Sequence, residues 1–196
     1  MAEADPVSAR PRGRVISYEE VVVGARRHFL RTSTIEMEPL AAELAVSRAT
    51  LYRVVGGRDR LLGDVLWSLG EPILTAARNS ATGTGIEWIL EISRRFYEGV
   101  IGAAPFRHFL DAEPQTAVRV LFTPAGRVHE RYVRAQREIF VEAIRRERIA
   151  LSPDLDSLAY LYVRIFESML YADLLSGRTP DVEPAERAAR ALLLAG

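Results

Sequence analysis

The sequence contains neither cysteine nor lysine. The absence of cysteine excludes disulfides, thiolate metal sites and a cysteine nucleophile. All 26 basic residues are arginine, and 26 acidic residues balance them. Affinity for nucleic acid must therefore come from a local basic patch and not from the net charge. Any role that a lysine often fills falls to an arginine in this chain.

Long apolar runs are also missing. No stretch of about 18 apolar residues occurs, and the first positions carry Glu3, Asp5 and three arginines where a secretory signal has an apolar region. We therefore expect a cytoplasmic protein without a membrane partner. The 196 residues, 48% of them hydrophobic and 27% charged, exclude general disorder and allow one domain or two small ones.

Signatures of enzymes are weak throughout the chain. The three histidines, His28, His108 and His129, lack the spacing of a metal site. Gly83 and Gly85 form half of a dinucleotide fingerprint, without its third glycine or its preceding strand. No nucleophile elbow or phosphate-binding loop occurs. We expect neither catalysis nor a metal or other cofactor.

The apolar pattern is helical from residue 17 onward, and no sustained alternation of β-branched and polar residues occurs, so we expect an all-α fold. Residues 1–16, with prolines and the spaced cations Arg10, Arg12 and Arg14, should form a flexible basic arm. A small domain over 17–57 and a larger one over 58–196 follow. The predicted helices are Ser17–Arg31, a short helix around Pro39, Ser47–Val54, Arg58–Arg78, Ile86–Ile101, Gly126–Ile149, Asp154–Ser176 and Pro184–Ala195, with a linker at Asn79–Gly85.

Residues 40–55 have the packing pattern of a helix-turn-helix, in which two short helices share a small apolar core. The second helix then exposes hydroxyls and arginines, which suit phosphate contacts and the reading of base edges in the major groove. Four arginines and a single acid lie between positions 48 and 60, so this neutral chain carries one local basic patch. Ala41 must be small because the next helix crosses close to it. The residues expected in the shared core are Leu40, Leu44, Val46, Leu51 and Val54.

The same stretch resembles the TetR family of bacterial transcriptional regulators. Three positions depart from the family's pattern: Ala45 replaces its turn glycine, Val55 its aromatic residue and Arg58 its lysine. A left-handed alanine costs roughly 1 kcal/mol, so Ala45 should strain the turn or shift it. The residues that match in order and spacing are Leu40–Ala41, Val46–Ser47, Thr50–Leu51–Tyr52 and Asp59 with Leu61–Leu62.

The resemblance implies how this surface meets DNA. Thr50, Tyr52 and Arg58 would hold the DNA backbone, whereas Arg48, Ala49 and Arg53 would face base edges. The arginines of the arm would add minor-groove or phosphate contacts. The complete set of predicted DNA-binding residues is Ser47, Arg48, Ala49, Thr50, Tyr52, Arg53 and Arg58.

Two late helices, Gly126–Ile149 and Asp154–Ser176, carry apolar residues on more than one face. The resemblance implies that they pair with their symmetry mates in a homodimer. Such a dimer suits a two-fold operator with half-sites about 34–36 Å apart. A core formed entirely within one chain is the alternative explanation of the same pattern.

Aromatic residues are concentrated in the larger domain, and the resemblance implies that they enclose an apolar effector pocket whose filling releases DNA. As a whole the chain also resembles regulators of quorum-signal lactone degradation, which implies a lactone or opened-lactone effector. Glu167 and Asp173 are the polar groups expected nearest the pocket. Each aromatic could instead belong to the plain core. The predicted lining residues are Trp67, Trp88, Phe96, Phe109, Phe122, Tyr162, Phe166 and Met169.

The sequence thus predicts a ligand-responsive transcriptional regulator. More specifically, it predicts a dimeric repressor that leaves a palindromic operator when a small apolar or amphipathic effector binds. One alternative is a helical small-molecule-binding or protein-interaction module without DNA binding, and another is an all-α enzyme. Substrate turnover would favour the enzyme, whereas salt-insensitive DNA binding that survives changes at Tyr52 and Arg58 would exclude the regulator.

Overall fold

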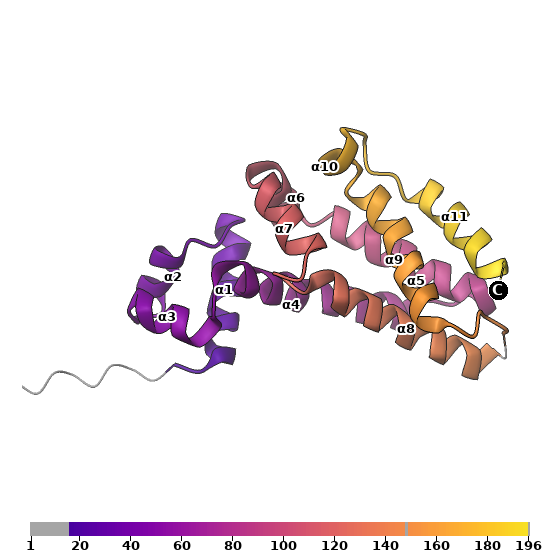
Figure 1. The fold of residues 1–196 in the computed structure, drawn as a ribbon, viewed down its shortest axis with the longest axis horizontal. Coiled ribbons are helices and arrows are strands. Elements are labelled where there is room, and N and C mark those ends of the chain that lie inside the picture. Colours follow the sequence, from indigo (N-terminus) through magenta and orange to yellow (C-terminus); the bar gives the residue numbers. More distant parts are fainter. Residues whose placement is uncertain (1–15, 148, 196) are drawn as a thin grey trace, which may run out of the picture.

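The computed structural model describes residues 16–147 and 149–195, so the predicted arm with Arg10, Arg12 and Arg14 lies outside the described residues. The described ranges fold into eleven helices and contain no strand, which confirms the all-α prediction (Figure 1). None of these helices is both long enough and apolar enough to cross a lipid bilayer.

The N-terminal module consists of α1 (Tyr18–Thr32), α2 (Met37–Glu43) and α3 (Arg48–Val55). Local signals set its boundaries. Ser17 and Glu20 form a capping box at the predicted start of α1. The hydroxyl of Ser47 accepts a hydrogen bond from the Thr50 N–H and caps α3. Gly56 ends α3 in the left-handed conformation, with φ of 78°.

Helix α4 (Arg58–Ser80) leads from the N-terminal module into the rest of the chain (Figure 1). It contains Pro72 and runs past the predicted end at Arg78, so the linker is shorter than the predicted Asn79–Gly85. The Glu91 carboxylate accepts hydrogen bonds from the backbone N–H groups of Thr82 and Gly83, at 2.9 and 2.8 Å. This contact ties the short connection to the next helix.

The remaining helices form the C-terminal module together with α4. The predicted helix over 154–176 is interrupted at Tyr171, whose ring packs edge-on against Phe106 and Phe122. The break between the two helices thus coincides with the residue whose ring joins this aromatic cluster. The helices are α5 (Gly85–Ile101), α6 (Ala104–Ala112), α7 (Pro114–Phe122), α8 (Val128–Glu147), α9 (Leu155–Leu170), α10 (Ala172–Ser176) and α11 (Val182–Leu194).

The two modules share one continuous apolar core. Phe29 of α1 packs edge-on against Phe109 of α6, with ring centroids 5.8 Å apart. Gly63 of α4 lies against the backbone of Gly126, where a Cβ atom would collide with the Gly126 carbonyl. The N-terminal module is therefore packed against α4 and α6, and α4 in turn lies against the turn before α8.

Candidate nucleic-acid interface and ligand cavity

The turn between α2 and α3 has the strained alanine expected from the sequence. Ala45 has φ of 53°, in the left-handed region, and the Val46 N–H donates to the Ala41 carbonyl at 3.0 Å. Leu44 packs so closely on Gly24 of α1 that a Cβ atom at Gly24 would meet its side chain. Neighbouring contacts thus hold the turn closed despite the unfavourable backbone angle.

Helix α3 has one buried face and one exposed face. Leu51 and Val55 are buried against α1 and α4. The other face carries Arg48, whose guanidinium lies 5.5 Å from the ring centroid of Tyr52. Tyr52 has 37% of its surface exposed, although large aromatic side chains are usually mostly buried. A cation beside an exposed phenol is suited to contacts with phosphates and base edges.

The predicted DNA-binding residues come together on this face. Thr50 is partly buried, and its hydroxyl is hydrogen-bonded to that of Ser47 at 2.9 Å. The exposed members of the set are Ser47, Arg48, Ala49, Tyr52 and Arg53. Neither Arg48 nor Arg53 forms an ion pair with any described residue. The face is therefore basic and free of internal neutralising partners within the described part of the chain.

Arg58 differs from the rest of the predicted set. Its guanidinium donates to both carboxylate oxygens of Glu113, at 2.6 and 2.7 Å, and to the Ile35 carbonyl at 2.6 Å. Burial favours the neutral form of Glu113, but the hydrogen bonds from Arg58 and Thr34 outweigh it and lower the pKa of this carboxyl. In this structure Arg58 links the start of α4 to the residue that precedes α7, and no local sequence pattern indicates this long-range pair.

Two further polar clusters are centred on carboxylates of α4. The buried carboxylate of Asp64 on α4 accepts hydrogen bonds from Tyr18 of α1 and Arg131 of α8. Asp59 pairs with Arg119 of α7, and hydrogen bonds from Arg119 lower the pKa of Asp59. Tyr18 thus ties α1 to α4, while the arginine–carboxylate pairs, including Arg58–Glu113, tie α4 to α7 and α8.

An apolar cavity of about 130 Å³ lies in the C-terminal module and reaches α1. Its wall includes Phe29 and Leu30, which the sequence analysis assigned to the N-terminal domain alone. The full lining is Phe29, Leu30, Leu66, Leu69, Gly70, Ile73, Phe96, Tyr97, Val100, Ala103, Pro105, Phe106, Leu121, Val128, Tyr132, Glu167, Leu170 and Tyr171.

Of the eight lining residues predicted from the sequence, Phe96 alone belongs to this wall. Phe166 lies directly behind it, stacked on Tyr97 with ring centroids 4.8 Å apart. Tyr162 faces Ser93, which its hydroxyl contacts at 2.8 Å. These side chains support the wall without facing the cavity. Helical spacing shows that a side chain points inward, but not whether it meets a cavity or another helix.

The other five predicted lining residues lie in neighbouring packing layers. Trp88 lies beneath the Arg146 guanidinium, and Phe109 contacts Phe29. Phe122 packs on Tyr171. Trp67 packs on the outer side of Tyr132 and lines a separate groove between α4 and α8. Met169 is partly buried against the core.

The polar part of the cavity wall is formed by Tyr97, Tyr132, Tyr171 and Glu167. Burial, assisted by the nearby Glu167 charge, raises the pKa of Tyr97 and that of Tyr132. Glu167 was expected near the pocket, and its carboxylate contacts His129 Nδ1 at 2.9 Å. Asp173, the other expected polar group, instead pairs with Arg107 at 3.2 Å and does not line the cavity.

Comparisons with known proteins agree with this architecture. Residues 84–194 match the tetracyclin repressor-like C-terminal domain. The transcriptional repressor QsdR of R. erythropolis, a solved structure from the TetR family, superposes with a TM-score of 0.85 at 29% sequence identity. That match covers 90% of this chain and 93% of the repressor. No curated protein matches the chain. With its helix-turn-helix module and the match over most of its C-terminal module, the chain belongs to the TetR family of transcriptional regulators.

Proposed function

We propose that this protein is a ligand-responsive repressor that binds a palindromic operator as a homodimer in the cytoplasm. The observation that carries the proposal is the exposed, unpaired basic face of α3, held on the same core as an apolar cavity. A ligand in the cavity touches Phe29 and Leu30 of α1, so its binding can favour one orientation of the N-terminal module over another.

A homodimer interface buries apolar surface, and the exposed large apolar side chains of α8, α9 and α11 lie on the last two, with none on α8 among the described residues. The outward side of α8 carries charged residues such as Glu130, Arg134 and Arg137. Leu161 of α9 is 49% exposed, and α11, which packs beside α9, exposes Ala188. We therefore retain the predicted segment 154–176 in the dimer interface and replace 126–149 by α11.

The direct test is a gel-shift titration against the intergenic DNA upstream of the protein's own gene, with nonspecific competitor and at two salt concentrations. We expect a specific shift that weakens steeply with salt, because arginine contacts to phosphates release counterions. Tyr52→Ala should weaken binding to all sequences alike, whereas Arg48→Ala should relax sequence preference. A loss that is equal on all sequences in Arg48→Ala would exclude a base-reading role for Arg48.

A matched control is Arg145→Ala, which removes an exposed arginine of α8, far along the chain from α3. It should leave the shift unchanged. Lactones are the first compounds to test for release of the DNA. A folded protein that gives no salt-sensitive shift on any upstream DNA would favour a small-molecule-binding module without DNA binding.

A further inference from the structure

The polar groups of the cavity lie together on an otherwise apolar wall. The hydroxyls of Tyr97, Tyr132 and Tyr171 form no hydrogen bond with any described residue, although Tyr97 and Tyr171 are buried. The Tyr132 hydroxyl lies against Gly70 of α4, where any larger residue would displace it. Buried hydroxyls normally find partners, so these three are available to a bound molecule.

The charge of the wall has one sign. Glu167 is the acidic residue of the lining, and none of the described residues that line the cavity is an arginine or a histidine. His129 and Arg164 do contact the Glu167 carboxylate, at 2.9 and 3.1 Å, but neither belongs to the lining. An anionic head group in this cavity would lose its hydration next to a carboxylate, without gaining a cation.

We propose that the cavity selects neutral molecules with an apolar body and a carbonyl head, such as amides, esters or ketones, and rejects the corresponding carboxylates. The carbonyl oxygen accepts hydrogen bonds from the tyrosine hydroxyls, and the apolar body lies among side chains such as Leu66, Ile73 and Phe96. This inference rests on the proposed function, because it names the chemical class of the effector.

Hexanamide and hexanoate test the inference because they have nearly the same shape and differ in charge at pH 7. Titration calorimetry on the whole protein should show hexanamide binding at least about tenfold more tightly than hexanoate. The reason is that the charged head group of hexanoate would be desolvated next to the buried Glu167 carboxylate, and a tenfold ratio of affinities corresponds to about 1.4 kcal/mol. Glu167→Gln should narrow the difference to less than about threefold, because it removes the repelling charge.

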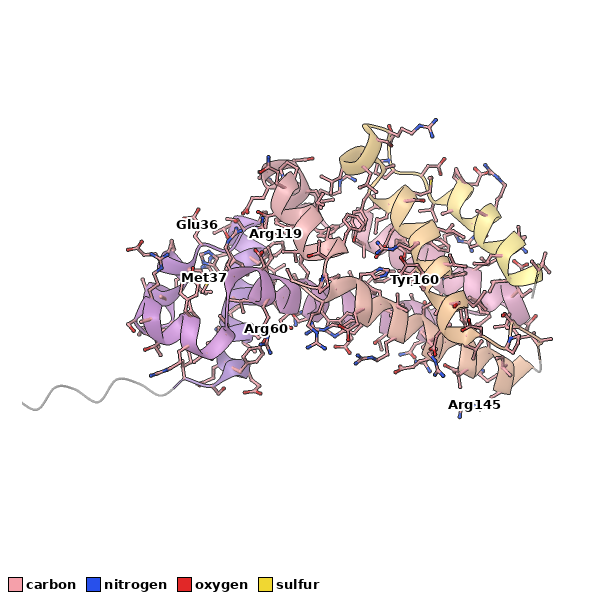
Figure 2. All side chains as sticks on the ribbon, viewed as in Figure 1. Glu36, Met37, Arg60, Arg119, Arg145 and Tyr160 are labelled. Atoms are coloured by element: carbon pink, nitrogen blue, oxygen red, sulfur yellow. The ribbon has the colours of Figure 1, made fainter. Side chains whose placement is uncertain are left out.

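The second arm tests the hydroxyls, which can be removed with little change in packing. Replacing Tyr97 and Tyr171 together by phenylalanine should weaken hexanamide binding by roughly five- to tenfold, the effect of one or two lost hydrogen bonds. Tyr160→Phe is the matched control, since Tyr160 lies on the exposed side of α9 (Figure 2) and outside the lining. It should leave hexanamide affinity unchanged.

Equal affinity for the two probes, tighter binding of hexanoate, or binding of neither would overturn the inference. Loss of affinity in the Tyr160→Phe control equal to that in the double variant would also contradict it. Gel shifts without ligand, run on the same preparations, distinguish failure of the proposed ligand class from failure of the proposed DNA-binding function. A protein that shifts DNA but binds both probes equally retains the regulator and loses only the ligand class.

Discussion

Single glycines at Gly63 and Gly126 permit the close approach of α4 to the turn before α8. A Cβ atom at Gly63 would collide with backbone, which cannot rotate away as a side chain can. We expect Gly63→Ala to lower the free energy of unfolding by about 2 kcal/mol, although alanine is the better helix former. Urea unfolding measures this change.

The control for that measurement is Gly57→Ala. No atom lies within 4 Å of the position where its Cβ would be, and its φ of 169° is extended backbone that any residue adopts. The urea midpoint of this variant should stay near that of the wild type. If both variants lose the same stability, the close approach at Gly63 is not the cause.

Glu91 is a single residue whose contribution to the free energy of unfolding depends on pH. Hydrogen bonds from the Gly83 backbone and then from Arg95 lower the pKa of its carboxyl from 4.5 to about 2. Because the folded pKa lies below the unfolded one, the stabilisation is complete above about pH 4.5 and disappears as the pH falls toward 2. The difference in urea midpoint between the wild type and Glu91→Gln should therefore be larger at pH 7 than at pH 3.

Glu98→Gln is the charge-matched control for that comparison, because Glu98 is an exposed residue of the same helix and forms no ion pair with a described residue. The effect of Glu98→Gln on the urea midpoint should not be larger at pH 7 than at pH 3. A Glu91 effect that grows on acidification would mean that the carboxylate does not stabilise the loop.

Local signals made several residues predictable. Ser17, Ser47 and the left-handed Ala45 lie within four residues of the groups that determine their roles. For Arg58 the sequence predicted a DNA contact and no contact within the protein, because its partner Glu113 lies 55 positions away. Sequence patterns report neighbours along the chain and cannot report a pair formed only by tertiary packing.

At the scale of elements, α4 and α7 meet through the Arg58–Glu113 pair, which competes with a phosphate for the Arg58 guanidinium. If Arg58 contacts the DNA backbone, Glu113→Gln should strengthen binding to specific and nonspecific DNA alike by about threefold, since a weaker partner is displaced. Fluorescence anisotropy titrations on both kinds of DNA measure this.

Glu138→Gln removes the same charge from α8, in the groove beside Trp67, and controls for the change in net charge. It should raise affinity much less than Glu113→Gln does. Weaker DNA binding in Glu113→Gln would show instead that the pair positions α4 and that Arg58 makes no phosphate contact.

Helix boundaries followed from the sequence more closely than the packing of helix faces did. The predicted Ser17–Arg31 and Ile86–Ile101 differ from α1 and α5 by a single residue at each changed end, because caps and glycines act locally. Trp88 and Phe96 are both buried on α5, yet only Phe96 reaches the cavity. That distinction depends on where α4, α8 and α9 cross α5, which periodicity does not encode.

At the scale of the whole molecule, the cavity and the DNA-binding face share structural elements. Phe29 and Leu30 line the cavity from α1, and Tyr18 of the same helix contacts Asp64 on α4. A ligand that alters the position of α1 must also act on the Tyr18–Asp64–Arg131 cluster. The polar contacts between the modules thus resist the movement that effector binding would favour.

The proposed homodimer can be tested through DNA binding, because a two-fold operator requires two recognition helices at a fixed separation. Leu161→Glu places a charge at an exposed apolar position of α9, where the proposed interface would desolvate it. Light scattering should change from twice the 21.9 kDa chain mass to the chain mass itself. Operator affinity should fall by about 100-fold or more as the second half-site is lost. Arg134→Glu on the charged side of α8 should leave the dimer intact, and a monomer produced by Arg134→Glu but not by Leu161→Glu would place the interface on α8.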